Sequence, residues 1–250
     1  MFKNNSILLN IPHSSKFILD YNEYYNDIEL LSEIEILTDH YIDEIFDISN
    51  NVNILSQIHN YSRFYCDVER YWNDELEIMS KFGHGVIYKN TCNGNKIRNE
   101  SEIDFNKIKN IYDNYYIEFN NKIKLLLEKY NNCLIIDCHS FNSIPLSMDL
   151  NKDLNRPDIC IGFNDNISNR FNTTLNYVRE FFIEKGYSIG FNNPFSGSIM
   201  TDQYKLKYNV DSIMIEINKK LYMNENTIEK NNNFENIKNI INELTLSLIN

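Results

Sequence analysis

The sequence predicts an α/β fold, a three-layer α/β/α sandwich with a central mixed sheet. Three observations lead to this prediction. Short apolar runs alternate along the chain with longer segments of helical periodicity. Several runs are apolar almost throughout, which is typical of strands that are covered on both faces. The runs end in polar residues, where a strand gives way to a loop.

Eight apolar runs predict strands, and four longer segments predict helices. The predicted strands are Ile7–Ile11, Val52–Ile58, Phe64–Val68, Gly85–Tyr88, Cys133–Cys138, Ile159–Phe163, Tyr187–Phe191 and Ser212–Ile217. The predicted helices are Ser32–Ile48, Asp104–Tyr130, Asn169–Lys185 and Asn226–Leu248. Asp104–Tyr130 has the clearest pattern, with apolar side chains at spacings of three and four from Ile108 to Leu126. Helices of this length between strands favour a sheet that is covered on both faces.

The asparagine-rich tract Asn224–Glu235 predicts an exposed loop that leads into the last helix. The chain shows neither an internal repeat nor a compositional boundary. Because 250 residues suit one substantial core, we expect a single domain over residues 1–250.

The composition, 42% hydrophobic and 13% aromatic, excludes disorder as the main state. A net charge of −11 argues against nucleic acid and membrane as partners, because both attract clustered Lys and Arg. No run of 18 apolar residues occurs and Met1–Asn5 lacks a signal-peptide pattern, so we expect a soluble, cytoplasmic protein. The five cysteines are odd in number without paired metal-type spacing, which argues against a disulfide framework.

Scarce residue types are informative in this chain. It contains no alanine and only four prolines, while Asn, Ile, Lys and Tyr are abundant, as expected when coding sequence drifts toward A and T. Pro12, Pro145, Pro157 and Pro194 all lie in or beside short polar segments. These segments are candidate site loops, although proline also marks ordinary turns.

Two histidines follow apolar runs at the point where functional groups gather in open α/β sheets. His13 follows the run that ends at Ile11, and His139 follows the run Cys133–Cys138. Two imidazoles, one carboxylate and a water form the usual open catalytic zinc site. Either histidine alone is more often a hydrogen-bonded structural residue, and that alternative stays open. The other three histidines carry weaker signals and are treated as surface or structural residues.

Several acids could complete a metal site. Glu35, Asp39 and Asp43 fall at i, i+4 and i+8 of the first predicted helix and would share one face, which by default is solvated. Asp67 is a further possible ligand, although it could pair with a neighbouring arginine instead. Asp137 precedes His139 closely enough to orient its imidazole.

Glu216 is the one acid within the last predicted strand, which is otherwise apolar except for Ser212 at its start. Burying a carboxylate is costly, so Glu216 is expected to be paired, protonated or lining a cavity, unless it points outward from an edge strand. Facing a metal-activated water, it would act as general base and then as proton donor to the leaving amine.

Arg63 and Arg70 flank one predicted strand in a chain with only six arginines. A guanidinium binds a carboxylate with two parallel hydrogen bonds, which suits a small anionic substrate. The alternative is an internal ion pair with Asp67 or Glu69, which we expect for at least one of the two arginines. Serine and thiol chemistry fit less well, since Gly-x-Ser-x-Gly is absent and adjacent strand residues such as Cys138 and His139 face opposite sides.

Taken in order, the polar segments resemble the N-formylglutamate amidohydrolase family, from residue 7 to 223. The matching segments are Asn10–Ser14, Thr38–Glu44, Ser62–Arg70, Asp137–Ser140, Asp158–Gly162, Asn193–Gly197 and Ile215–Asn218 with Leu221–Met223. The resemblance implies a zinc-carboxypeptidase-like (phosphorylase/hydrolase-like) α/β/α fold and one zinc ion per chain that activates water toward an amide carbonyl.

The resemblance also implies roles for single residues. The metal ligands would be His13, His139 and Asp39, with Asp39 chosen because its segment matches the family. Glu216 would be the general base, and Arg63 would polarise the carbonyl or stabilise the oxyanion. The residues expected to bind substrate are Arg70, Asn193 and Ser140.

Two departures from the resemblance matter. Relatives often read Asp-x-Asn-Arg where this chain has Asp67-Val68-Glu69-Arg70, so Glu69 could neutralise Arg70 and alter substrate choice. Lys16 stands three residues after His13, where zinc carboxypeptidases have a glutamate ligand.

The function expected from these residues is hydrolysis of the amide of a small N-acyl amino acid. The reference substrate is N-formyl-L-glutamate, which would give formate and L-glutamate. Two alternatives stay open: an amidase or carboxypeptidase of peptide or cell-wall fragments, and a non-catalytic module that binds an anionic ligand.

Overall fold

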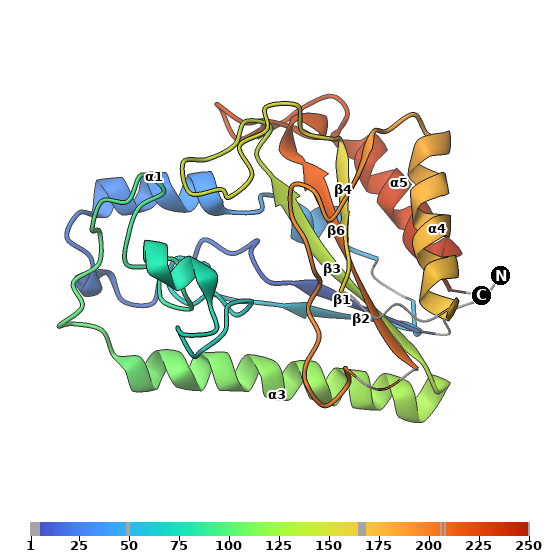
Figure 1. Cartoon of the computed structure of the whole chain (residues 1–250), viewed down its shortest axis with the longest axis horizontal. Helices are drawn as coiled ribbons and strands as arrows, with labels where there is room; N and C mark the ends of the chain where they lie inside the picture. Colours follow the sequence, from blue (N-terminus) through green and yellow to red (C-terminus); the bar gives the residue numbers. More distant parts are fainter. Residues whose placement is uncertain (1–5, 49–50, 165–168, 206, 208, 250) are drawn as a thin grey trace.

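A central mixed β-sheet organises the molecule, which is a computed structural model (Figure 1). It describes residues 6–48, 51–164, 169–205, 207 and 209–249. The described residues form one six-stranded sheet. In spatial order its strands are β2 (Ile54–Ile58), β1 (Ile7–Ile11), β3 (Cys133–Phe141), β6 (Val210–Asn218), β4 (Ile159–Gly162) and β5 (Ile189–Phe191). Every neighbouring pair is parallel except β4 and β6, which confirms the predicted mixed sheet.

Helices cover both faces of this sheet, as predicted (Figure 1). The long helix α3 (Phe105–Tyr130) lies along one face, and α4 (Asn169–Glu184) and α5 (Phe234–Ser247) lie on the other with the short α2 (Ile42–Ile45). The remaining elements are α1 (Asp27–Leu37), the hairpin β7 (Met223–Asn224) and β8 (Glu229–Lys230), and the 3-10 turns Tyr21–Glu23, Ile78–Phe82 and Lys219–Leu221. No helix in the described part of the chain combines the length and apolar character that a membrane span requires.

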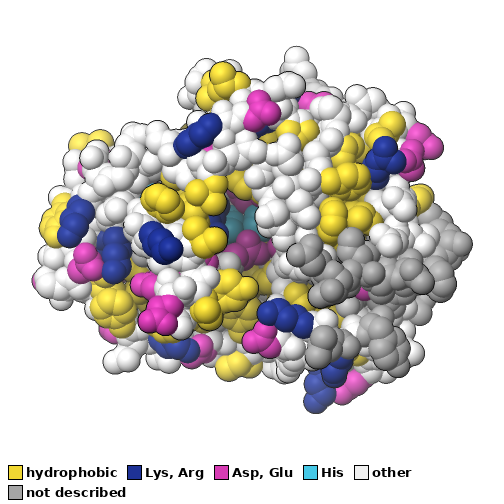
Figure 2. Space-filling model, in the orientation of Figure 1, with side chains coloured by type: hydrophobic (Ala, Val, Ile, Leu, Met, Phe, Trp, Pro, Cys, Tyr) yellow, Lys and Arg dark blue, Asp and Glu magenta, His cyan; other side chains and the backbone are white. Residues whose placement is uncertain are grey.

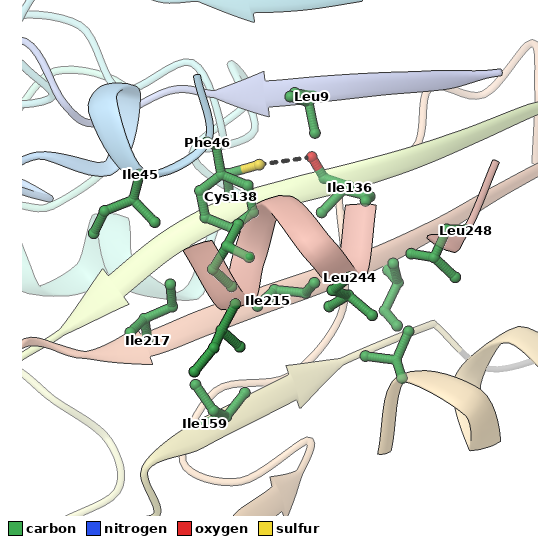
Figure 3. Packing of buried hydrophobic residues seen from close by; sticks show 14 of the residues in the cluster. Leu9, Ile45, Phe46, Ile136, Cys138, Ile159, Ile215, Ile217, Leu244 and Leu248 are labelled. Carbon is green, nitrogen blue, oxygen red and sulfur yellow. Dashed lines mark hydrogen bonds between the residues drawn. The ribbon is translucent and has the colours of Figure 1, made fainter. Parts of the chain in front are cut away.

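The alternation of side chains along the strands divides the core between the two helical layers. Leu9 and Ile215 belong to one apolar cluster with Leu244 of α5 (Figure 3). Leu8 points the opposite way and belongs to a second cluster with Phe119 of α3. Burial on both faces explains why these strands read as continuous apolar runs.

Two predicted strands are wrong. Phe64–Val68 and Gly85–Tyr88 lie in turns and loops, although most of their side chains are buried. These segments pack in a third apolar cluster at the α1 side of the sheet, and Arg98 bonds the backbone carbonyls of Phe64 and Tyr65. These segments are therefore apolar because they are buried as irregular backbone, and not because they pair as strands.

Two predicted helices have different limits. Ser32–Ile48 is broken: α1 ends at Leu37, Thr38 is extended and Tyr41 has a φ of 64°. The expected shared helical face of Glu35, Asp39 and Asp43 is consequently wrong, because Asp39 lies in the break. The last helix begins at Phe234 and not at residue 226, since the β7–β8 hairpin occupies the preceding segment.

Candidate metal and catalytic site

The candidate residues meet where three neighbouring strands end. His13 lies two residues beyond β1, and His139 lies in β3, which pairs with β1 in parallel. Glu216 of β6 is the register partner of His139. Partners in register project from the same face of a sheet, so the imidazole and the carboxyl stand side by side. Figure 2 shows histidine and acidic side chains at the bottom of a hollow in the surface.

The two imidazoles face each other through their Nδ1 atoms. His13 Nδ1 lies 3.3 Å from His139 Nδ1. Asp39 Oδ2 lies 3.1 Å from His139 Nδ1 and 3.7 Å from His13 Nδ1. The backbone N–H of Asp39 donates to the His13 carbonyl oxygen at 3.0 Å, which fixes the chain at the helix break beside the histidine. All three side chains are buried.

The opposite nitrogens of both rings contact carboxylates. His13 Nε2 lies 2.9 Å from Asp67 Oδ1. His139 Nε2 lies 3.0 Å from Glu69 Oε2 and 3.2 Å from Asp137 Oδ1, which places Asp137 where the sequence predicted an orienting carboxylate. A carboxylate behind each imidazole is the usual support of a metal-ligating histidine, because it fixes the ring and its tautomer.

Two groups of side chains could therefore hold a metal ion. Ligand atoms of His13, Glu69 and His139 all lie within 4.8 Å of one another. The alternative group replaces Glu69 with Asp39 and uses the Nδ1 atoms. Its three separations of 3.3, 3.1 and 3.7 Å bracket the ~3.3 Å edge of a tetrahedron with zinc bonds of about 2.0–2.1 Å. In the group with Glu69, Glu69 Oε2 lies 3.9 Å from His13 Nε2, an atom that Asp67 contacts at 2.9 Å.

Asp67 contacts both His13 and the two arginines, Arg63 and Arg70. Its Oδ2 accepts hydrogen bonds from Arg63 Nε at 3.2 Å, Arg63 Nη2 at 2.9 Å and the Tyr88 hydroxyl at 3.0 Å. Arg70 Nε lies 3.7 Å from the same oxygen. Burial alone would raise the pKa of Asp67, but His13 and Arg63 hold this pKa well below its usual range. The expected internal ion pair of at least one arginine is confirmed.

Glu69 and Asp137 form a carboxyl pair behind His139. The Asn10 amide donates to Glu69 Oε1 at 3.1 Å and to Asp137 Oδ1 at 2.8 Å. Burial and the Asp137 charge raise the pKa of Glu69, whereas His139 lowers the pKa of Asp137 against the effect of burial. The pKa values of the two carboxyls are thus shifted in opposite directions, that of Asp137 downward by the imidazole and that of Glu69 upward by burial and the Asp137 charge.

Glu216 is 7% exposed and lies within the sheet, so it does not point outward from an edge strand. Its Oε2 has no hydrogen-bond partner among the described residues. Burial raises the pKa of Glu216 to about 8, opposed by the charge of His139. A carboxyl that titrates near neutral pH and lines a cavity is suited to exchange protons with a substrate or water.

These side chains line a cavity of about 1210 Å³. The predicted site residues that line it are His13, Asp39, Arg63, Arg70, His139, Ser140 and Glu216. Asn193 is not part of this lining: its side chain is exposed and accepts a hydrogen bond from Asn151 at 2.6 Å. Glu35 and Asp43 also lie outside the lining, and Glu35 pairs with Lys16 at 2.9 Å.

A comparison with models of protein families gives a match to this chain. A family model described as N-formylglutamate amidohydrolase matches residues 5–223. The chain belongs to the N-formylglutamate amidohydrolase family. Every predicted site residue of this family member lies within the matched range.

The solved structures that match this amidohydrolase-family chain include two that share its fold over nearly its whole length. The crystal structure of N-formylglutamate amidohydrolase from Ralstonia eutropha JMP134 has a TM-score of 0.80 and 18% identity, over 99% of this chain and 94% of that one. Gene product Atu2144 from Agrobacterium tumefaciens has a TM-score of 0.63 and 14% identity, over 99% of this chain and 93% of that one. The comparison with curated proteins found no match.

Sequence reasoning missed three residues that this family member brings to the site. Asn10 is a polar residue within a buried strand, the same signal that identified Glu216. Tyr88 binds Asp67 from a segment that was wrongly predicted as a strand. Lys219 is buried and lines the cavity, three residues after Glu216, and no sequence pattern distinguished it from the other lysines.

Proposed function

We propose that this member of the family is a zinc-dependent amidohydrolase of small N-acyl amino acids, with N-formyl-L-glutamate as the reference substrate. The products would be formate and L-glutamate. The observation that carries the proposal is the triangle of His13 Nδ1, His139 Nδ1 and Asp39 Oδ2 beside Glu216, at the bottom of one cavity. Three protein ligands of this kind leave a fourth position open, as in catalytic zinc sites.

The residues around the triangle supply acid–base and electrostatic roles. A bound zinc ion would polarise the amide carbonyl and lower the pKa of a water molecule. Glu216, which lines the cavity beside His139 with an Oε2 that has no partner among the described residues, would take a proton from the attacking water and return it to the leaving nitrogen. Arg63, held on Asp67 at 2.9 Å, would stabilise charge that develops on the carbonyl oxygen.

The substrate contacts follow from the same lining. Arg70 has a buried Nε with no hydrogen-bond partner among the described residues, which supports a role in binding a substrate carboxylate. Ser140 is buried and lines the cavity on the strand that carries His139.

Metal content tests the ligand set. Purified protein is expected to hold one zinc ion per chain by elemental analysis. Asp39→Asn should lose most of this zinc. Glu69→Gln should keep its zinc, with an affinity that is weaker by at most about 10- to 100-fold, because this is the usual effect of removing a residue that only orients a metal ligand. The reverse pattern would place the ion with Glu69.

Activity tests the reaction. Zinc-loaded protein should release formate from N-formyl-L-glutamate, lose this activity with a chelator and regain it with zinc. Protein that binds no divalent ion and gains no amidase activity from zinc would contradict the proposal.

A second candidate substrate class is a peptide or cell-wall fragment. The cavity of about 1210 Å³ exceeds the ~300–1,000 Å³ typical of small-molecule sites, so it has room for a larger amide. A panel of N-acyl amino acids and short peptides separates the two, since kcat/KM should be highest for the class that the enzyme uses.

A further inference from the structure

Lys219 differs from the other buried cations of the molecule. Three lysine or arginine side chains are buried within the described ranges: Arg98, Arg156 and Lys219. Arg98 is paired with Glu23, and Arg156 lies 2.6 Å from Asp149. Lys219 is 4% exposed, and none of the described carboxylates approaches its ammonium within 4.0 Å, although the charges of Asp39, Glu225 and Glu216 act on it from farther away. A buried charge is costly unless it is paired, so this ammonium lacks a direct counter-ion.

The contacts of Lys219 leave donors free. Nζ donates one hydrogen bond, to the Ile36 carbonyl oxygen at 3.2 Å, in the last turn of α1. An ammonium has three donors, so one carbonyl does not satisfy it among the described residues. The carbonyl at a helix end explains why a cation is tolerated there, but it does not explain why the side chain also lines the cavity.

The neighbours of Lys219 favour a ligand from the cavity. Ser140 pairs with Ile217 in the β3–β6 ladder, one residue from the end of β6, and Lys219 follows that end directly. Ser140 is buried and lines the same cavity, with its hydroxyl beside that of Tyr222, so it keeps hydrogen-bonding capacity for a ligand. Lys220, the next residue, instead pairs with Asp158 at 3.1 Å and does not line the cavity.

We propose that Lys219 and the Ser140 hydroxyl form a binding subsite for one carboxylate of the amino-acid part of the substrate. The proposal rests on the proposed function for the identity of that substrate. A bound carboxylate gives the ammonium its missing counter-ion through charge-assisted hydrogen bonds. The subsite is separate from Arg63 and Arg70, which both contact Asp67.

Kinetics with matched substrates test this subsite. Lys219→Met should raise KM for N-formyl-L-glutamate by about 10- to 100-fold with little change in kcat, which is the range expected for a lost hydrogen bond to a charged group. N-formyl-L-glutamine and the α-amide of N-formyl-L-glutamate each lack one carboxylate. On the analogue that lacks the carboxylate bound by Lys219, the KM of Lys219→Met should stay close to the KM of the wild type. The analogue with this behaviour identifies which of the two carboxylates Lys219 binds. Lys220→Met is the matched control and should change none of the three.

A purely structural role for Lys219 gives a different result. It would lower activity on all three substrates by the same factor, and that outcome would overturn the subsite. Lys219→Arg should restore much of the affinity because it keeps the charge, which a fold defect in Lys219→Met would not mimic.

Binding of glutarate separates the subsite from the proposed function. Calorimetry should show that the protein binds glutarate and that Lys219→Met, but not Lys220→Met, weakens this binding about 10-fold or more. If no N-acyl amino acid is hydrolysed while this pattern holds, the proposed function fails and the subsite stands. If hydrolysis occurs and Lys219→Met changes neither KM nor glutarate binding, or if the protein binds no glutarate, the subsite fails.

Discussion

Two regions of the molecule hold the candidate site by different means. The sheet presents His139 and Glu216 from hydrogen-bonded strands that pair in register. Residues 60–104 contribute no strand to that sheet, yet they present Asp67 and Glu69 from turns. The difference shows that backbone ladders are one way to fix a side chain and that buried polar contacts are another.

The polar contacts of the turn region centre on Arg98. Its guanidinium is fully buried, donates to Glu23 and to the carbonyls of Phe64 and Tyr65, and lies 5.0 and 5.2 Å from the rings of Tyr24 and Tyr65. The segment that follows carries Asp67. A charged side chain therefore takes the place that strand pairing has in the sheet.

Glu216→Gln tests the sheet side of the comparison and has the largest expected effect. Loss of the general base should lower kcat by about 10²- to 10⁴-fold while the zinc content stays unchanged. Steady-state kinetics and elemental analysis measure the two quantities, and Glu243→Gln on the exposed face of α5 serves as control. Unchanged turnover would mean that another group moves the proton.

Arg98→Met tests the turn side. It leaves the Glu23 carboxylate buried without its partner, so the free energy of unfolding should fall by about 3–5 kcal/mol. Chemical denaturation measures this, with the exposed pair variant Arg179→Met as a control near zero. The double variant Glu23→Gln with Arg98→Met should recover part of the lost free energy of unfolding. A double variant less stable than Arg98→Met would show that the unpaired Glu23 charge does not cause the loss.

Asp67→Asn tests the junction of the two regions. The amide keeps the size but loses the charge that orients His13 and Arg63, so zinc affinity and kcat/KM should each fall by about 10- to 100-fold. Competition with a chelator measures the affinity. Asp202→Asn, which removes an exposed acid that pairs with Lys205, should change neither quantity.

His59 gives the smallest expected effect, a pH dependence of stability. Burial lowers the pKa of His59 to about 4, with its Nε2 3.1 Å from the Cys66 carbonyl oxygen. Below pH 6.5 the unfolded chain binds a proton that the folded chain does not, so stability falls as the pH drops toward 4. From pH 7 to 5 this amounts to about 2 kcal/mol. Denaturation of the wild type and His59→Gln at both pH values checks it, since the variant should lose correspondingly less stability; equal losses would contradict the assignment.

The contrast between the sheet and the turn region explains which parts of the fold and of the candidate site the sequence predicts. The sequence predicts the strand Ile7–Ile11 with its observed limits and selects His13, His139 and Glu216, which the structure brings to one cavity, because apolar runs and their ends are local patterns. Phe64–Val68 was misread as a strand because burial of turns leaves the same apolar pattern. The partners of a buried polar group, such as Arg98 with Glu23, depend on contacts far apart in the chain.

Asp39 illustrates the limit most clearly. Periodicity places it with Glu35 and Asp43 on one helical face that is solvated by default, and the resemblance to the family is what selects Asp39 from the three acids. The helix in fact ends at Leu37, and the chain turns Asp39 inward toward His13. Helical periodicity extends across this break, so the local pattern contains no signal for it.

The register between β3 and β6 also bears on how such a protein changes over evolutionary time. Nine consecutive register pairs join the two strands, and a slip of one residue would set Ile215 or Ile217 opposite His139 in place of Glu216. The loops around the cavity take no part in this ladder. Insertions, deletions and exchanges in those loops can therefore alter which molecules enter while the spacing of the reactive groups is inherited intact.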